Sequence, residues 1–332
     1  MSMPEESRRF LADLGLIAVA AIWGVNFSVM KVVLGELDPL ALNALRFPMA
    51  ALAMGLILKA TPGPLLPDRD DLWRVVLLGV VGNVLYQLCF IIGLDWTLAG
   101  NASLLLATTP AWTLLFSRLA GHEALTGAAL AGVAATLVGI ALVVLGRGEA
   151  LTLDSRTLAG DFLMLVASTL WALYTVAGLG PVSRYGALRM TTWTLWVGTP
   201  ILVVLGVPSL QATDLAGVSG GAWLGVVYAG LLSIALAYLL WYRGVRILGN
   251  NRTAIYSNLV PVMALLTAWL WLGEVPGALQ LIGAAIILTG LTAARFAQSA
   301  RSGDPGSRAA GPKPPLSSGE ASPARWRISG NS

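Results

Sequence analysis

The sequence is poor in the residues that catalysis and metal binding need. Its 332 residues include one cysteine, Cys89, and one histidine, His122. A single cysteine excludes an internal disulfide and a cysteine metal cluster, and a lone histidine excludes a histidine-based metal site. We therefore expect no cofactor and no metal, and we find no nucleophile–base pair from which an enzyme could be built.

Charge is scarce as well. Only 11% of the residues are charged, against roughly 25% in an average soluble domain. No Asp or Glu lies in the middle of an apolar run, so the usual buried carboxylate of a proton-driven antiporter is missing. The sequence also has no Gly-Lys-Ser/Thr phosphate-binding loop, which excludes ATP as the energy source.

Apolar residues, by contrast, make up 56% of the chain, and the mean hydropathy is +0.75. Apolar runs of about 20 residues recur along it, each long enough to cross a hydrocarbon layer of roughly 30 Å. The pattern predicts an all-α membrane protein embedded in the lipid bilayer. We expect ten transmembrane helices, over 11–34, 39–58, 72–94, 99–119, 126–145, 160–182, 188–207, 220–242, 252–272 and 277–296.

The chain contains an internal duplication. A shift of 151 positions places Gly93 on Gly244, Pro110 on Pro261, Glu123 on Glu274, Gly132 on Gly283 and Gly139 on Gly290. Five spans per copy is an odd number, so the second copy must enter the membrane from the opposite side. This predicts two inverted five-helix repeats around a central cavity, an architecture in which transporters place the substrate site near the midplane. The predicted parts are a cytoplasmic N-terminus (1–10), a first repeat (11–145), a linker (146–159), a second repeat (160–296) and a disordered cytoplasmic tail (297–332).

Basic residues set the expected orientation. Arg8, Arg9 and the basic residues from Arg295 onward flank the two ends of the chain, whereas several turns of the other side carry no Lys or Arg. Because cytoplasmic segments are enriched in Lys and Arg, both termini are expected in the cytoplasm. The net charge of +4 is explained by this topology, so we expect no nucleic-acid partner.

Polar and aromatic residues recur on single helical faces. Trp23, Asn26 and Met30 are spaced i, i+3 and i+7, and such residues within a span must face inward because unpaired polar groups in hydrocarbon cost several kcal/mol. Inward faces either pack as a structural hydrogen-bond network or line a cavity that holds substrate. The candidate substrate-binding residues are Trp23, Asn26, Met30, Arg46, Asn83, Tyr86, Gln87, Thr108, Trp112, Trp171, Tyr174, Tyr238 and Asn258.

Arg46 is the one basic residue well inside a span. It either faces the cavity and orients an anionic group such as a carboxylate, or extends toward the outer surface, or pairs with Glu36 or Asp38. The corresponding part of the second repeat holds Thr192 and no basic residue. An anionic group would therefore be held on one side of the cavity only.

Two prolines and two glutamates mark the duplicated stretch. Pro110 and Pro261 are candidate hinges, because each frees the carbonyl four residues earlier and kinks its helix. A kink can merely improve packing, whereas a freed carbonyl beside a wet cavity can bind a ligand. Glu123 and Glu274 lie in the turns before the fifth and tenth spans, where each is expected to cap the helix that follows.

The repeat resembles the EamA-type module of the drug/metabolite transporter superfamily. The resemblance rests on Ala21-Ile22-Trp23-Gly24-Val25-Asn26-Phe27, on Ala44-Leu45-Arg46-Phe47, and on Pro110 through Glu123 with its second copy at Pro261 through Glu274. It implies ten helices, a central cavity and a small-molecule substrate, most often an exported amino acid or related compound. Among members the chain is most similar to aromatic amino-acid exporters, since its expected cavity faces are rich in Trp and Tyr.

These observations together predict a secondary transporter that exports small metabolites, above all aromatic or other apolar amino acids, by alternating access. We expect a multi-pass monomer in the bacterial inner membrane. The alternatives are a multidrug or quaternary-cation efflux carrier, in which the aromatic faces would make cation–π contacts, and a non-transporting receptor or assembly subunit.

Overall fold

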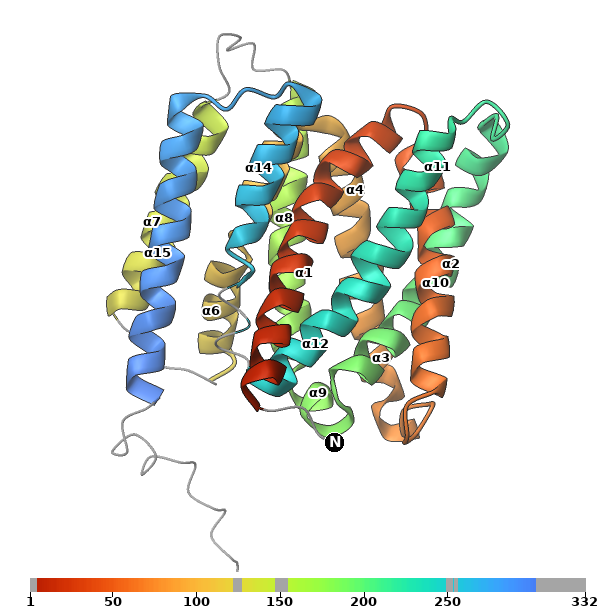
Figure 1. Ribbon diagram of the computed structural model, residues 1–332, viewed down its shortest axis with the longest axis horizontal. Coiled ribbons are helices and arrows are strands. Elements are labelled where there is room, and N and C mark those ends of the chain that lie inside the picture. Colours follow the sequence, from red (N-terminus) through yellow and green to blue (C-terminus); the bar gives the residue numbers. More distant parts are fainter. Residues whose placement is uncertain (1–4, 122–126, 147–154, 249–252, 254–255, 303–332) are drawn as a thin grey trace, which may run out of the picture.

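The chain forms a bundle of helices and turns in a computed structural model that describes residues 5–121, 127–146, 155–248, 253 and 256–302 (Figure 1). No strand occurs among these residues. The described helical segments are α1 (Glu5–Leu34), α2 (Pro39–Lys59), η1 (Arg69–Asp71), α3 (Leu72–Val80), η2 (Val81–Leu85), α4 (Tyr86–Trp96), α5 (Ala99–Leu106), α6 (Thr109–Leu119), α7 (Gly127–Leu145), α8 (Ser155–Ala177), α9 (Leu179–Tyr185), α10 (Ala187–Ala212), α11 (Gly220–Val227), η3 (Tyr228–Leu236), α12 (Ala237–Leu248), α14 (Leu259–Leu272) and α15 (Ala278–Ser302).

Six of these helices or continuous helical segments are long and apolar enough to cross a membrane. They are Glu5–Leu34, Pro39–Lys59, Arg69–Trp96, Ser155–Ala177, Ala187–Ala212 and Gly220–Leu248, and shorter apolar helices occupy Ala134–Leu145, Leu259–Leu272 and Ala278–Gly290. Large apolar side chains such as Leu52, Leu56 and Leu224 are exposed on the outside of the bundle, where lipid takes the place of water. The structure agrees with a multi-pass membrane protein, and the count of ten crossings stays a prediction.

Several predicted boundaries were wrong by more than one helical turn. Helix α1 begins at Glu5 rather than at residue 11, and α8 begins at Ser155 and ends at Ala177, after which α9 follows as a separate short helix. The eighth helical stretch continues to Leu248, and α15 continues to Ser302, so the predicted tail begins within a helix. Hydropathy misses such extensions because polar helical ends project beyond the apolar run. Residues 122–126 and 303–332, and with them His122 and Glu123, lie outside the described residues.

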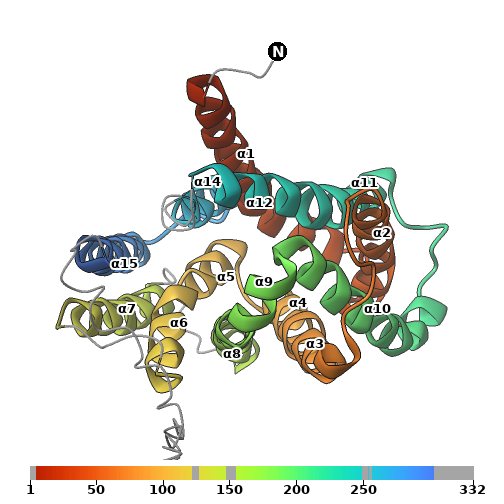
Figure 2. The ribbon, with the colours of Figure 1, turned by 90° about the horizontal axis from the view of Figure 1, so that it is seen from below.

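The bundle has two outer helix pairs and a middle made of the remaining helices. Helices α7 and α15 pack side by side at one edge, and α2 packs against α10 at the other (Figure 2). Between them, α1 packs on α12 and α14, while α8 packs on α4, α5 and α6. The largest apolar cluster lies among these middle helices and includes the fully buried Met30, Leu42, Ile91, Leu105 and Met164. Residues near Met30 are therefore held in a packed environment.

Two π-helical segments interrupt the third and eighth predicted spans, which are equivalent in the two copies. They are η2, which contains Gly82, and η3, which contains Gly230. The sequence separation between these two glycines equals that between Trp23 and Trp171. A Cβ atom on Gly82 would lie 2.4 Å from the ring of Tyr174, and one on Gly230 would lie 2.8 Å from the carbonyl oxygen of Arg46. The two glycines therefore permit close contacts between helices. They lie in π-helical segments, which are frequent at functional sites.

Both candidate hinge prolines follow a break in their helix. Helix α5 ends at Leu106 and α6 starts at Thr109 with Pro110 next, while α14 starts at Leu259, two residues before Pro261. The carbonyl of Leu106 accepts the hydroxyl of Thr109 at 2.7 Å, and the carbonyl of Ser257 accepts the N–H of Val260 at 3.2 Å. The carbonyls that the prolines free therefore have partners within the chain.

Candidate functional site

Aromatic side chains from four helices gather in the middle of the bundle in two sets of ring contacts. Trp171 and Tyr174 of α8 stack with ring centroids 5.2 Å apart, and Trp171 lies 4.9 Å from Tyr86 of α4. On the other side, Trp23 of α1 lies 5.9 Å from Tyr238 of α12, which stacks on Tyr242 at 6.0 Å. Helical spacing presents these rings inward, where they pack against one another in stacked, tilted or edge-on arrangements. We call this group, Trp23, Tyr86, Trp171, Tyr174, Tyr238 and Tyr242 with Trp241, the aromatic belt.

Arg46 is buried beside the belt, with 3% of its surface exposed. Its Nε donates to Oδ1 of Asn43 at 3.0 Å, Nη1 to Sδ of Met30 at 3.1 Å and Nη2 to Oε1 of Gln87 at 2.8 Å. The guanidinium also lies close enough to Tyr86 and Tyr238 to interact with both electrostatically. The interpretation that Arg46 extends to the outer surface is therefore wrong.

The predicted pairing of Arg46 with Glu36 or Asp38 is wrong as well. The Glu36 carboxylate accepts hydrogen bonds from Ser219, and the Asp38 side chain caps α2 by accepting the N–H of Leu40 at 2.9 Å. Among the described residues no carboxylate lies within ion-pair distance of Arg46. Within the described part of the chain, the acceptors that hold this cationic side chain are all neutral.

Asn26 continues this polar group toward α1. Its side chain is 6% exposed, and its Nδ2 donates to the same Met30 sulfur at 3.1 Å. Its Oδ1 is buried and meets no hydrogen-bond donor in the described part of the chain. Of the predicted site residues, Asn26, Met30, Arg46 and Gln87 are therefore joined by direct contacts.

The remaining predicted residues lie in other surroundings. Thr108 is fully buried, and its hydroxyl donates to the Leu105 carbonyl and lies 2.9 Å from the hydroxyl of Ser168. Trp112 is half-buried, and its indole nitrogen has no partner among the described residues. Asn83 lies in η2 against Gly198, and Asn258 directly precedes α14. Nothing in these contacts brings Thr108, Trp112 or Asn258 to Arg46.

Sequence reasoning missed several residues of the site. Asn43 lies one turn before Arg46, and Trp241 and Tyr242 lie one turn after Tyr238, so helical periodicity could have found all three. Thr191 hydrogen-bonds to the hydroxyl of Tyr242, and the indole N–H of Trp23 donates to the carbonyl of Ser233 at 2.9 Å. A backbone acceptor carries no side-chain signal, so the last contact could not be read from the sequence.

Two groups of hydrogen bonds join loops at the ends of the bundle. At one end the carboxylate of Glu36, between α1 and α2, accepts the backbone N–H and the hydroxyl of Ser219 at 2.7 Å each. The backbone bond and then the hydroxyl bond hold the pKa of Glu36 below its ordinary value, because both favour the ionised form. We call this contact between the α1–α2 turn and the N-terminus of α11 the Glu36 clasp.

At the other end, the loop before α3 meets α9. Arg184 donates to Oδ2 of Asp71 at 2.8 Å and to Oδ2 of Asp68 at 2.6 Å, and the Tyr185 hydroxyl donates to both carboxylates. Burial, together with these hydrogen bonds to Asp71 and Asp68, raises the pKa of Tyr185 to about 12. We call this group the Arg184 clasp, and it keeps the two loops together.

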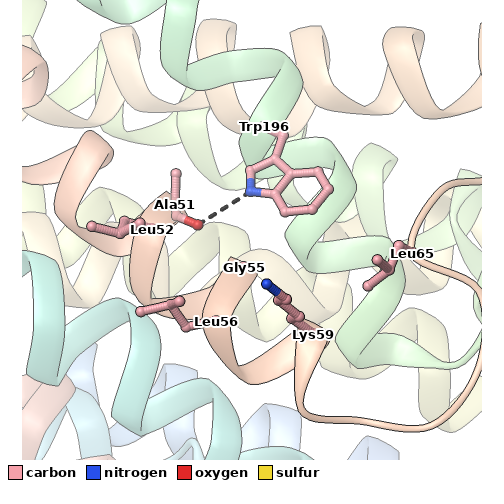
Figure 3. Close-up of a pocket in the computed structure, with 7 residues that line it drawn as sticks. All are labelled: Ala51, Leu52, Gly55, Leu56, Lys59, Leu65 and Trp196. Carbon is pink, nitrogen blue, oxygen red and sulfur yellow. Dashed lines mark hydrogen bonds between the residues drawn. The ribbon is translucent and has the colours of Figure 1, made fainter.

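A hollow of about 380 Å³ is present on the outside of α2 and α10 (Figure 3). The indole N–H of Trp196 donates to the carbonyl of Ala51 at 3.1 Å across it, and the exposed Leu52 and Leu56 form its rim. It contains none of the predicted site residues. The hollow is lined by Ala51, Leu52, Gly55, Leu56, Lys59, Leu65 and Trp196.

A multi-pass helical bundle with an inward-facing polar and aromatic group is typical of membrane transporters, and the comparisons with known proteins agree. The model of the EamA-like transporter family matches residues 10–145 and again residues 158–295. The chain belongs to this family, which confirms the resemblance seen in the sequence.

Named relatives are transporters. The chain is 26% identical over 281 residues to the uncharacterized transporter YyaM of Bacillus subtilis, covering 84% of this chain and 92% of the relative. It is 29% identical over 279 residues to a probable terminal-alkyne amino-acid exporter of Streptantibioticus cattleyicolor, covering 83% and 90%. It is 26% identical over 287 residues to a probable amino-acid metabolite efflux pump of Escherichia coli, covering 83% and 91%.

A solved structure supports the fold. One protein of known crystal structure superposes with a TM-score of 0.58 at 20% identity, covering 88% of this chain and 98% of the other. The family and these relatives together identify the protein as a transporter of small molecules in a membrane, with exporters and efflux pumps among its relatives.

Proposed function

We propose that the protein is a secondary transporter that exports small metabolites, above all amino acids with aromatic or other apolar side chains, by alternating access. The observation that carries this proposal is the position of Arg46, a buried cation without a carboxylate partner in the described chain, beside aromatic rings from both halves. The rings suit an apolar side chain, and the guanidinium suits a carboxylate. Relatives named amino-acid exporter or efflux pump support the substrate class.

The architecture that this mechanism needs is two inverted repeats, ten crossings in all. Lys31 at the end of α1 donates to the carbonyls of Leu94, Asp95 and Thr97, and Arg156 at the start of α8 pairs with Asp95 at 3.1 Å. The end of α1 and the start of α8 therefore lie at the same end of α4, so these two helices run in opposite directions. They are the first helices of the two copies, and their opposition supports inversion.

Helix pairing supports the same proposal. Helix α2 packs against α10, and α7 packs against α15, which pairs the second and fifth spans of each copy with their counterparts. Helix α1 of the first copy packs on α12 of the second, and α8 of the second copy packs on α4 of the first. The two contacts are therefore equivalent when the copies are exchanged. The aromatic belt draws its rings from helices of both halves, so we place it at the seam between the proposed repeats. A central cavity at the seam is part of the proposal.

Orientation and assembly follow from the same reasoning. We place the protein in a bacterial inner membrane with both termini in the cytoplasm. The start of α1, which carries Arg8 and Arg9, lies at the same end of the bundle as α9, which carries Arg184 (Figure 1), and cytoplasmic segments are enriched in Lys and Arg. We also propose that the protein works as a monomer.

A cation carrier fits the site less well. The aromatic belt could make cation–π contacts, but Arg46 would repel a cation, and the described residues offer no carboxylate near it. Binding of an organic cation at this site is therefore disfavoured on charge, while an anionic or zwitterionic solute is favoured.

The test is counterflow in proteoliposomes with a panel of amino acids, nucleosides and cationic dyes, with and without a pH gradient. Wild-type protein should exchange aromatic amino acids, and Trp23→Ala and Tyr86→Ala should reduce the rate about tenfold or more, as expected when buried aromatic contact with a ligand is lost. Trp73→Ala is the matched control, because Trp73 is 62% exposed on the outside of the bundle. Folded protein that exchanges no solute would support a receptor or assembly subunit instead.

A further inference from the structure

Two buried polar groups with unused hydrogen-bonding capacity flank one sulfur atom. Sδ of Met30 accepts from Nδ2 of Asn26 and from Nη1 of Arg46, both at 3.1 Å. Oδ1 of Asn26 is a buried acceptor with no donor among the described residues. Buried polar side chains in proteins are almost always paired, so an unpaired one at a candidate site points to a ligand.

Arg46 has unused donors on the other side of the sulfur. A guanidinium carries five N–H groups, and Arg46 donates one hydrogen bond to each of Asn43, Met30 and Gln87. One N–H on each terminal nitrogen is left without an acceptor in the described part of the chain. Two N–H groups on neighbouring nitrogens are what a carboxylate engages in a bidentate contact. The thioether of Met30 is a weak acceptor, so a carboxylate can displace it at little cost.

We infer that Asn26 and Arg46 form a recognition site for a zwitterion, in which Arg46 holds a carboxylate and Oδ1 of Asn26 accepts from an ammonium group on the neighbouring carbon. This rests on the proposed function and assigns the recognition of the amino and carboxylate groups of its amino-acid substrate to two named residues. An α-amino acid presents the two groups on one carbon atom, and Arg46 and Asn26 meet at one Met30 sulfur. The side chain of the amino acid then lies toward the aromatic belt.

The pair of Arg46 and Asn26 should select for ligands that carry both charged groups, because a ligand that lacks one leaves a buried polar group of the protein unpaired. An amine without a carboxylate leaves the Arg46 charge buried and uncompensated, which is costly within a membrane. A carboxylate without an ammonium group leaves Oδ1 of Asn26 unpaired. A site whose buried polar groups stay unsatisfied rejects such analogues strongly. The substrate must therefore carry both groups.

Four compounds that share one ring test the inference on wild-type protein by counterflow. They are L-phenylalanine, phenethylamine, which lacks the carboxylate, 3-phenylpropanoate, which lacks the ammonium group, and L-phenylalanine amide. We expect exchange of phenylalanine, with the three analogues slower by about tenfold or more, as loss of a hydrogen bond to a charged group implies. An amine or acid analogue that is exchanged as fast as phenylalanine would overturn the inference. Exchange of none of the four by folded protein would instead contradict the proposed function.

Two variants distinguish substrate recognition from a purely structural role, because each should change the relative exchange rates of different compounds. Arg46→Gln should slow phenylalanine and raise phenethylamine relative to it, while Asn26→Ala should raise 3-phenylpropanoate relative to phenylalanine. Asn101→Ala is the matched control, because Asn101 is a buried amide that accepts from Gln280 at 2.5 Å, away from the Arg46 contacts. Equal loss for all four compounds in both site variants would overturn the inference, and the wild-type panel decides the matter if a variant fails to fold.

Discussion

The carboxylate of Glu274 accepts the backbone N–H of Ala99 at 2.9 Å across a sequence separation of 175 residues. Its second oxygen accepts the N–H of Gly100, also at 2.9 Å. Ala99 and Gly100 begin α5, so Glu274 caps a helix of the first half and not α15, the helix that follows it in the chain. Glu274 does cap a helix, as predicted, but the prediction that it caps the helix following it in the chain was wrong. The positive end of α5 reaches Glu274 only because the two halves of the chain pack together.

Loss of this cap should destabilise the protein. We expect Glu274→Ala to lower the free energy of unfolding by about 1–2 kcal/mol, since two N–H groups at the start of α5 lose their acceptor. Glu274→Gln should cost less, because an amide oxygen can still accept one bond. Thermal unfolding in detergent measures both, with Glu5→Gln as the control at an exposed carboxylate. Equal melting temperatures for wild type and Glu274→Ala would contradict the prediction.

The Arg184 clasp should control the separation of its two loops. We expect Arg184→Ala to increase the mean distance, or broaden the distance distribution, between spin labels at Asp70→Cys and Ser183→Cys in a Cys89→Ala background. The physical reason is that Arg184 bonds both Asp68 and Asp71 across the two loops. Pulsed electron paramagnetic resonance gives the distances, and Arg9→Ala, at an exposed pair within α1, is the control. A distribution unchanged by Arg184→Ala would show that the loops are held by other contacts.

The contribution of the Glu36 clasp to the stability of the protein should change with pH only in the acidic range. Because the hydrogen bonds from Ser219 lower the pKa of Glu36, the ionised form is the one that folding favours. Its contribution to stability is therefore complete above the ordinary pKa of about 4.3 and is lost as pH falls through the lowered value. The stability difference between wild type and Glu36→Gln should be constant from pH 5 to 8 and shrink below about pH 4. A difference that changes near neutral pH would refute this assignment.

The contact between α2 and α10 should not tolerate a methyl group at Gly206. A Cβ atom there would lie 2.5 Å from Cβ of Ala44 and 2.5 Å from the carbonyl oxygen of Leu40. Backbone cannot move aside as a flexible side chain does, so Gly206→Ala should cost about 1–3 kcal/mol. Gly180→Ala is the matched control, since nothing lies within 4 Å of its added Cβ atom. Chemical or thermal unfolding compares the two, and similar effects would contradict the packing described for Gly206.

Local sequence patterns determined the class of the protein and the helix faces that matter. Apolar runs identify membrane helices because hydrocarbon leaves a backbone few alternatives to a helix. The spacing of Trp23, Asn26 and Met30 places them on one face whatever surrounds them, and the structure joins Asn26 to Met30. Pro110 and Pro261 each follow a helix break, but other prolines of the chain lie inside continuous helices, so a proline alone does not determine where a helix ends.

Only the tertiary structure decided which distant groups meet. Arg46 could be placed inside a span from the sequence, but its partners on α1 and α4 depend on how the helices pack. The same holds for Glu274 and α5, for Glu36 and Ser219, and for Arg184 and Asp68, each pair more than a hundred residues apart. Helical periodicity fixes the direction of a side chain around its own axis. The partner that it finds depends on the rotation, tilt and neighbours of that helix, which the packing of the whole bundle sets.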